Sequence, residues 1–308
     1  MHRSFVRIVT RQGGVFTREQ ALEICSAAEV RSRLRRGVWR RTPWTGIYVD
    51  GELPDDVPML VRAASAWLGG DLVACHSTAA LLWGFDLRTP EAAAAGRLHF
   101  LGPADMDNRL LRRLQVHPSS LGTADAVLRA GVWCTPPART ACDVARLGLP
   151  IDALATLDAA LRSRTCDRED LTAARVRQRG LRGVARLERL VPLADPRAES
   201  PIESRMRWRF LDARLPAPDL QVEVRDGVRW HRLDVGWREH RLGAEFDGLE
   251  AHMTRRQLQD DRDRHNWLTE RRWTLLHFTA VDVYRRWEPM VAGVRRYLVG
   301  TGPTIMTP

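Results

Sequence analysis

Hydrophobic and polar residues alternate with different periods along the chain, and these periods divide it into three parts. In residues 1–50, short runs with a helical period are separated by glycines and followed by a stretch that alternates at every second residue. Residues 55–190 are rich in alanine and leucine, which favours helices. Residues 199–298 combine one helical run with three alternating runs. The pattern predicts a fold of the α/β class, α+β overall, with an α-rich middle domain.

Two capping motifs predict helices in the first part. Thr17 is followed three residues later by Gln20, and Ser26 is followed three residues later by Glu29, so each pair can form a capping box. Gly37 is a natural residue to end the second of these helices. Residues 38–50, VWRRTPWTGIYVD, then alternate like a small hairpin. Residues 1–50 are therefore predicted to form a winged helix-turn-helix domain.

Arginines lie along the last of these helices and on the predicted hairpin. In DNA-binding domains of this type, the second helix of the motif enters the major groove. The alternative is a solvated basic face with no ligand. The residues predicted to contact DNA are Arg31, Arg33, Arg35, Arg36, Arg40 and Arg41.

The middle part, residues 55–190, carries little recognisable chemistry. His76, Ser77 and Asp143 have the residue types of a hydrolase triad, but no Gly-x-Ser-x-Gly turn surrounds Ser77. Ser77 and Thr78 are more typical of a helix cap. After this part, residues 191–201 contain three prolines and are predicted to be a linker.

The C-terminal part, residues 202–300, shows the clearest pattern. A helical run at 201–215 is followed by alternating runs at 220–224, 232–237 and 241–247. Because side chains alternate between the two faces of a strand, Glu245 and Asp247 share a face, and Asp234 can lie opposite them across a hairpin. Three carboxylates at close range repel one another unless a cation neutralises them.

This arrangement predicts a metal site at Asp234, Glu245 and Asp247. Carboxylate oxygens with waters and a substrate phosphate suit Mg²⁺, or Mn²⁺ in its place. Such an ion polarises a phosphate and activates a bound water. The alternative is that these acids pair with the many arginines on a solvated sheet face.

The amino-acid composition indicates which partner the protein binds and in which cellular compartment it works. The chain of 308 residues has a formal net charge of +10 and no lysine, so all 48 basic residues are arginine. Arginine grips phosphate with paired hydrogen bonds, so DNA or another polyanion is the expected partner. The five cysteines are scattered without a Cys-x-x-Cys pair, which argues against a zinc site and a disulfide framework. With no apolar run long enough for a membrane span or a signal peptide, a cytoplasmic protein is expected.

Residues 1–190 resemble the AbiEi family of antitoxins from type IV toxin–antitoxin systems. In that family the first domain binds the promoter of its own operon, and the second supports partner contacts. The resemblance therefore implies DNA and a toxin or defence-system protein as partners, and leaves the oligomeric state open. It rests on GGVFT at 13–17, LRRG at 34–37, GIYV at 46–49, HSTAALLWGF at 76–85 and CTPPARTACDVAR at 134–146.

Residues 199–284 resemble the very-short-patch-repair-like branch of the PD-(D/E)XK nuclease superfamily. The implied domain is restriction-endonuclease-like, with a helix, three strands, a helix and a strand in that order. The resemblance implies a metal-dependent endonuclease. It rests on ESPIES at 199–204, RLDVGW at 232–237, GAEFDGLEAH at 243–252, DRDRHNWL at 261–268 and WTLLHFTAVDV at 273–283.

If the residue roles of this nuclease branch apply to this chain, Asp234 and Glu245 would bind the metal ion. Glu203 would orient water or complete the metal shell. Asp247 stands where the superfamily name places lysine, although this branch often has Asp-Gly there. The group that stabilises the phosphorane charge is then His252, Arg264 or a second metal ion. His252 has an alternative role in capping or packing, and Arg264 in an intrahelical ion pair with Asp261.

Three hypotheses follow from the sequence. The first is a metal-dependent DNA endonuclease, a phosphodiester hydrolase targeted to DNA by the winged helix, with the substrate structure and RNA cleavage left open. The second is a non-catalytic DNA-binding regulator of antitoxin type. The third is a protein–protein module without salt-dependent affinity for DNA.

Overall fold

The computed structural model describes residues 3–70, 72–85, 96–102, 113–118, 126–248 and 255–299. The chain divides into two compact units, each described here by itself. The first comprises residues 1–148 and 169–178, and the second comprises residues 149–168 and 179–308. The predicted boundaries at 50–55 and 191–201 lie inside these units, and as limits of domains they stay predictions.

The beginning of the first unit has the predicted winged-helix arrangement, three helices with a small antiparallel sheet of strand order β1-β3-β2. Both capping boxes are formed, Thr17 with Gln20 and Ser26 with Glu29. Gly37 takes the left-handed conformation directly after the third helix, with φ of +73°. The elements are α1 (Arg3–Arg11), β1 (Val15–Thr17), α2 (Arg18–Leu22), α3 (Ala27–Arg35), β2 (Trp39–Arg41) and β3 (Ile47–Asp50).

The middle of the chain is helical, as predicted, but it also holds a five-stranded mixed sheet that the sequence did not predict. Its order is β6-β5-β4-β8-β7. Its strands have two to five residues, too few to show a clear alternation. The elements are α4 (Val57–Leu68), β4 (Val73–Ala74), α5 (His76–Trp83), β5 (Leu98–Gly102), β6 (Leu114–Pro118), β7 (Val127–Arg129), β8 (Val132–Cys134), α7 (Pro137–Leu147) and α9 (Arg168–Arg177).

One hydrophobic core joins the winged helix to this sheet. Val15 and Val49 of the small sheet pack in the same cluster as Met59 of α4 and Phe100 of β5. A second cluster, around Phe16 and further aromatic rings, lies within the winged helix itself. The winged helix is therefore packed onto its neighbour in the first unit, which fixes the direction in which α3 faces solvent.

The second unit begins with helices and a well-packed connection. Residues 191–201, predicted as a linker, contain a short 3-10 helix, and Val191, Ala194 and Ala198 are buried. The prolines bend the chain here, but its small apolar side chains face the core, so the segment is part of the packed unit. The helical elements are α8 (Pro150–Arg162), α10 (Val184–Leu190), η2 (Val191–Leu193) and α11 (Pro201–Asp212).

The remainder of the second unit has the predicted order of a helix, three strands, a helix and a strand. The sheet order is β12-β11-β10-β9, with β9, β10 and β11 antiparallel and β12 parallel to β11. All three predicted strands are present. The elements after α11 are β9 (Asp219–Arg225), β10 (Trp230–Trp237), η3 (Arg238–His240), β11 (Leu242–Phe246), α12 (Arg255–Glu270), β12 (Thr274–Phe278), α13 (Ala280–Tyr284) and α14 (Trp287–Leu298).

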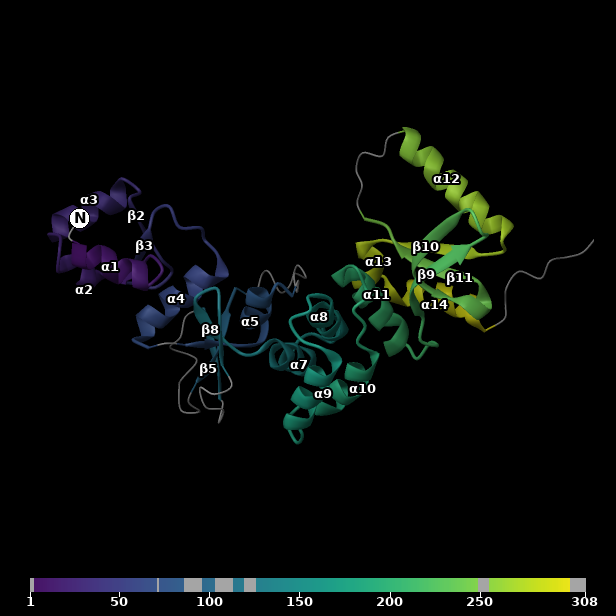
Figure 1. Ribbon diagram of the computed structural model, residues 1–308, viewed down its shortest axis with the longest axis horizontal. Helices are drawn as coiled ribbons and strands as arrows, with labels where there is room; N and C mark the ends of the chain where they lie inside the picture. The colour runs from purple at the N-terminus through teal and green to yellow at the C-terminus, as the bar shows by residue number, and fades with distance from the viewer. Residues whose placement is uncertain are drawn as a thin grey trace, which may run out of the picture. The chain divides into compact units, whose positions relative to one another are not determined.

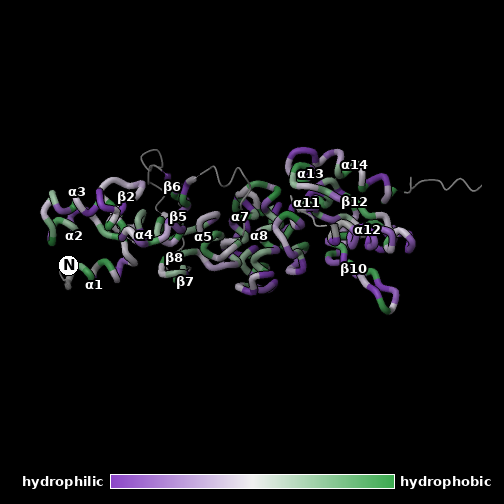
Figure 2. Tube along the Cα trace, turned by 90° about the horizontal axis from the view of Figure 1, so that it is seen from above, coloured by the Kyte–Doolittle hydropathy of each residue, from purple (hydrophilic) through white to green (hydrophobic). Residues whose placement is uncertain are grey.

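Two clusters cover this sheet. Phe210 of α11 and Val294 of α14 pack with Val235 and Ala244 of the sheet. Trp267 and Leu268 of α12 pack instead with the outer ends of β9 and β10. Figure 1 shows α12 on one side of the strands, apart from α11 and α14. In Figure 2, hydrophobic residues lie along α8, whereas most residues of the exposed helix α12 are hydrophilic.

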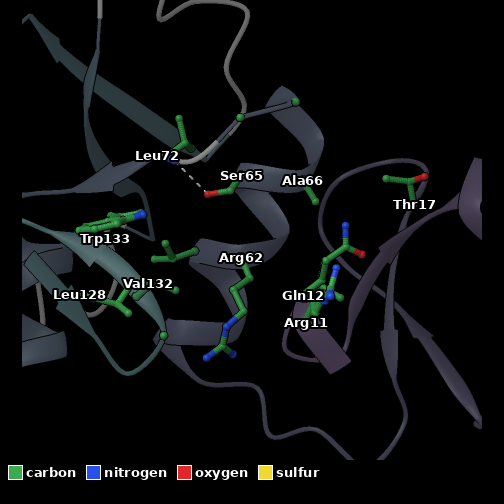
Figure 3. A pocket seen from close by; sticks show the side chains of 15 residues that line it. Arg11, Gln12, Thr17, Arg62, Ser65, Ala66, Leu72, Leu128, Val132 and Trp133 are labelled. Carbon is green, nitrogen blue, oxygen red and sulfur yellow. Dashed lines mark hydrogen bonds between the residues drawn. The ribbon is translucent and has the colours of Figure 1, made fainter. Parts of the chain in front are cut away.

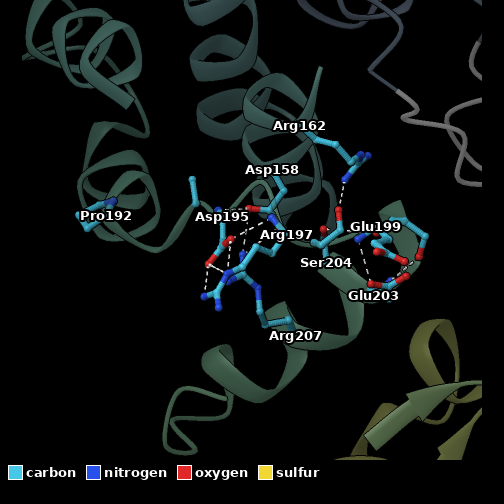
Figure 4. Close-up of polar contacts among 12 residues, drawn as sticks. Asp158, Arg162, Pro192, Asp195, Arg197, Glu199, Glu203, Ser204 and Arg207 are labelled. Carbon is cyan, nitrogen blue, oxygen red and sulfur yellow. Dashed lines mark hydrogen bonds and ion pairs between the residues drawn. The ribbon is translucent and has the colours of Figure 1, made fainter. Parts of the chain in front are cut away.

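Buried ion pairs connect α8 to α11. Arg207 of α11 donates hydrogen bonds of 2.8 and 2.9 Å to both oxygens of Asp158, whose side chain is fully buried (Figure 4). Asp158 also accepts a hydrogen bond of 2.8 Å from the backbone N–H of Asp195. Two residues earlier on α11, Arg205 pairs at 2.9 Å with Asp152, which lies six residues before Asp158 on α8. These pairs set the rotation of α11, the helix that carries Glu203.

We expect Arg207→Met to destabilise the protein by about 3–5 kcal/mol, because it leaves the buried carboxylate of Asp158 without its cation. The double variant with Asp158→Leu should recover most of this loss. Urea unfolding measures both. The matched control is Arg189→Met, which removes an exposed ion pair to Asp212 and should cost at most about 1 kcal/mol. Equal losses for the buried and exposed pairs would contradict this account.

Candidate functional site

The acidic residues predicted from strand alternation gather at one hollow of the second unit. In the antiparallel register of β10 and β11, Val235 pairs with Ala244, so Asp234 and Glu245 are the next opposed pair. Both line a hollow of about 530 Å³ together with Asp247 and Arg264. The structure thus brings the three predicted acids to one place, while their role as metal ligands stays a prediction.

Glu203 joins this group from the neighbouring helix. Ser200 caps α11 by accepting a hydrogen bond from the backbone of Glu203, which places this side chain in the first turn. Its carboxylate accepts hydrogen bonds from the backbone N–H of Glu199 at 3.0 Å and from Gln221 Nε2 at 3.1 Å. Burial raises the pKa of Glu203, and the charge of Asp234 raises it further.

Burial also raises the pKa values of the two opposed acids, Asp234 and Glu245. Burial raises the pKa of Asp234, although a hydrogen bond of 2.9 Å from the backbone N–H of Phe246 opposes the shift. Burial also raises the pKa of Glu245, and the charge of Asp234 acts in the same direction. Three carboxylates that are buried within reach of each other's fields favour a bound proton or a cation.

An arginine supplies one such cation. Arg264 of α12 forms a hydrogen bond of 2.9 Å through Nη1 to Glu245 Oε2, and its Nη2 contacts Oε1 of the same carboxylate. Nη2 also donates to the backbone oxygen of Arg232 at 3.0 Å. Arg264 therefore pairs with Glu245, and the predicted alternative of an ion pair with Asp261 is wrong. Its guanidinium already partly neutralises the acid cluster.

Asp247 lies in the same hollow but faces a different partner. Its backbone N–H donates to the oxygen of Phe278 at 2.8 Å, and its half-exposed carboxylate lies 3.0 Å from His277 Nδ1. His277 pairs with Glu245 in the register of β11 and β12, and sequence reasoning missed it. The signal for His277 was weak, because a parallel partner strand is separated from β11 by the whole of α12.

The backbone is distorted beside these acids. Gln221 of β9 has φ of +52°, a left-handed conformation that is unusual for a residue other than glycine. The register between β9 and β10 runs from Leu233 with Val222 to Val235 with Leu220, and the intervening pair of Asp234 and Gln221 is not formed. Strain of this kind often occurs at functional sites. Here it frees Gln221 to bind Glu203.

His252, the remaining predicted residue of this site, lies outside the described residues. Glu199 was missed as a site residue, although it contributes to the field at Asp234 and Glu203. It pairs with Arg232 at 2.9 Å. Figure 4 shows it beside Glu203 at the start of α11. The sequence signal that could have identified Glu199 is its place in ESPIES at 199–204, the phrase that also contains Glu203.

The arginines predicted to bind DNA differ in their availability. Arg31, Arg35, Arg36 and Arg41 are exposed on α3, at its end and on β2. The guanidinium of Arg33 lies 4.9 Å from the ring centre of Trp39. These five residues keep the position that the winged-helix interpretation requires.

The sixth, Arg40, is held by partners in its own unit. Its guanidinium binds Asp55 at 2.7 Å, the backbone oxygen of Gly51 at 3.2 Å and that of Leu53. Three partners within its own unit hold the side chain against the segment that follows β3. Arg40 therefore braces the wing, and its place among the DNA contacts stays a prediction.

A second hollow, of about 520 Å³, lies in the first unit between α1, α4 and the β7–β8 hairpin (Figure 3). Two of its polar side chains hold backbone groups of the same unit. Arg62 donates to the oxygen of Ala130 at 2.7 Å, and Ser65 accepts from the N–H of Leu72 at 3.2 Å. These contacts brace the junction between the winged helix and the five-stranded sheet.

The chain is similar in sequence to known proteins. Two relatives from Mycobacterium tuberculosis are each 38% identical to the chain over 257 residues, which is 83% of this chain and 91% of the relative. They are Uncharacterized protein MT2308, from strain CDC 1551 / Oshkosh, and Uncharacterized protein Rv2248, from strain ATCC 25618 / H37Rv. The chain belongs to the family of these mycobacterial proteins.

Residues 72–193 of this chain match the family model described as the AbiEi antitoxin C-terminal domain. The predicted AbiEi resemblance is therefore confirmed for the middle of the chain. The nuclease resemblance of residues 199–284 stays a prediction. In the part of the chain that the structure describes, every helix is too short or too polar to cross a bilayer.

The raised pKa of Asp234 predicts a stability that changes with pH. The ordinary pKa of an aspartate is about 3.9. A folded-state value above this means that stability is fully present below about pH 4 and is lost as the pH rises through the raised value. Asp234→Asn keeps an acceptor for the N–H of Phe246 and removes the charge. It should raise the free energy of unfolding at pH 7, with a gain that shrinks toward pH 4.

Urea unfolding at the two pH values checks this. The matched control is Asp226→Asn, because a hydrogen bond from the backbone of Arg229 lowers the pKa of Asp226. A lowered pKa stabilises above the ordinary value, so this variant should lose stability at pH 7. A gain for Asp234→Asn that is the same at both pH values would contradict the linkage.

Proposed function

We propose that this protein is a DNA-binding regulator of the AbiEi antitoxin type, which binds duplex DNA through α3 and the β2–β3 wing. The observation that carries the proposal is the exposed arginine face at α3 and β2, followed in the chain, after α4, by the segment at 72–193 that matches an antitoxin domain. A protein partner of the toxin class is part of this proposal.

The structure of the winged helix supports this use of its arginines. Phe16 and Val30 belong to the core beneath α3, while Arg31, Arg35 and Arg36 face solvent. A recognition helix must be held by its apolar face and must leave its polar face open to the groove. The surplus of positive charge adds attraction for phosphate at any DNA sequence.

We expect Arg35→Ala with Arg36→Ala to weaken binding to the DNA upstream of the protein's own gene by at least about tenfold. The slope of log affinity against log salt should become shallower by about 2, because two phosphate contacts are lost. Fluorescence anisotropy over a salt series measures both quantities.

The control is Arg177→Ala with Arg179→Ala, which removes the same charge from exposed positions outside the winged helix. If both double variants change affinity and slope equally, the effect comes from net charge and the assignment to α3 fails. If the wild-type protein binds no duplex with salt-dependent affinity, the regulator proposal itself fails.

A second candidate function is a metal-dependent endonuclease, favoured by the convergence of Glu203, Asp234 and Glu245. All three residues supply carboxylate oxygens, the ligands of a hard divalent cation such as Mg²⁺, and they form a buried, mutually repelling group. In the described residues these oxygens do not all lie within 4.8 Å of one another, so a bound cation would have to draw them together. Such an ion would polarise a phosphate and activate water there. Glu245 would first have to release Arg264, which could then face the phosphate as a cation.

This candidate predicts nicking of supercoiled plasmid with Mg²⁺ or Mn²⁺ that falls at least about a hundredfold in Asp234→Asn and in Glu245→Gln. Asp219→Asn is the matched control, since this exposed acid on β9 pairs with Arg238 away from the cluster. Gel densitometry over time gives the rates. No cleavage of duplex, mismatched or single-stranded DNA by the wild-type protein would exclude the candidate.

A further inference from the structure

Three histidines and a cysteine converge in the first unit, far from the acid cluster in sequence. Cys75 and His76 follow strand β4, His99 lies on β5, and His117 lies on β6. These strands are neighbours in the order β6-β5-β4, and the N–H of Cys75 donates to the oxygen of His99 at 2.9 Å. The sheet therefore brings together groups that are up to 42 residues apart, from Cys75 to His117.

The geometry of the group suits a single small cation. One potential ligand atom each from Cys75, His76 and His117 lies within 4.8 Å of the other two. His76 Nδ1 lies 3.0 Å from Cys75 Sγ, and the rings of His76 and His117 are stacked with centres 3.9 Å apart. A tetrahedral zinc ion holds sulfur and nitrogen ligands roughly 3.3–3.8 Å from one another, so small rotations of these side chains would close the site.

His76 supplies an independent sign of a missing partner. Its side chain is 8% exposed, and its Nε2 is one of the buried polar atoms in the described structure without a hydrogen-bond partner. The residue also has φ of +48°. A buried nitrogen without a partner is unfavourable, and so is a left-handed histidine. A metal ion bound at Nε2 would supply this missing partner, and because the contact to Cys75 Sγ is made by Nδ1, the ring would turn to bring Nε2 toward the thiolate.

The protonation states also suit ligation. Burial lowers the pKa of His76 to about 2 and that of His99 to about 4, and it lowers the pKa of His117 as well. An imidazole binds a metal ion through the lone pair of its neutral form. Burial raises the pKa of the Cys75 thiol, and a cysteine that binds a metal ion gives up its proton.

Neighbouring side chains contact this group in the way that residues around a metal site orient its ligands. Nδ1 of His99 lies 2.8 Å from Nε2 of His117, a contact that fixes the proton position and the ring orientation of His117. The buried carboxylate of Asp143 acts on both Cys75 and His117 and favours positive charge there. Arg139 and Arg146, which bind Asp143 at 2.6 and 3.0 Å, oppose it, so a thiolate would balance the added cation.

We propose that Cys75, His76 and His117 bind a zinc ion that clamps strand β6 to the junction of β4 and α5, with His99 orienting His117. Thiolate and imidazole ligands select zinc over magnesium. The partly exposed side of His117 leaves the fourth position to water. Thr78, predicted to cap α5, instead accepts a hydrogen bond of 2.7 Å from the N–H of His99, which ties the helix start to the same strand.

The test uses the full chain, stripped with a chelator and titrated with Zn²⁺ alone. We expect one equivalent to bind at micromolar concentration, the melting temperature to rise, and Co²⁺ in its place to give a thiolate-to-metal charge-transfer band. Both the band and the thermal shift should be lost in Cys75→Ser and in His117→Gln. Since His117 is only partly buried, its variant tests the site even if Cys75→Ser does not fold.

Two controls separate this site from others. Cys134→Ser alters another buried cysteine, whose strand pairs with β4 at Ala74, and Asp234→Asn alters the acid cluster. Both should bind zinc and keep the cobalt band. Absence of stoichiometric binding by the wild-type protein would overturn the proposal. So would a band that survives in His117→Gln or disappears in Cys134→Ser.

Discussion

The pairing of buried carboxylates with arginine is the interaction on which the helical packing depends. Asp143 in the first unit and Asp152 and Asp158 in the second are buried, and each is held by an arginine. Because the chain has no lysine, every such pair uses a planar guanidinium that can bind two oxygens at once. In the second unit these pairs fix α11 against α8, and the first turn of α11 carries Glu203.

Local features of the fold could be predicted from sequence, since they depend on neighbours within a few residues. The capping boxes at Thr17 and Ser26, the helix at 201–215 and the three alternating strands were all predicted correctly. The five-stranded sheet was missed, because most of its strands pair across long stretches of sequence and all are too short to show a period. The segment 191–201 was taken for a linker because proline content does not show that Val191 and Ala198 are buried.

The candidate site shows the same limit at the level of single side chains. Alternation was enough to place Asp234 and Glu245 face to face. It could not give the partner of Glu245, which comes from α12, or that of Asp247, which comes from β12. The cysteine and histidine group escaped for a related reason. Zinc motifs are recognised by ligands close in sequence, whereas these ligands are assembled by the order of strands in a sheet.

The distortion at Gln221 has a mechanical consequence for the β9–β10 hairpin. Inward of this point, Leu220 and Val235 pack with α11, while outward of it Val222 and Leu233 pack with Trp267 of α12. The hairpin thus crosses from one core to the other where one pair of backbone contacts is absent. Each half of the hairpin is therefore anchored in its own core, one against α11 and the other against α12. Asp234 lies at the point where the hairpin passes from one core to the other.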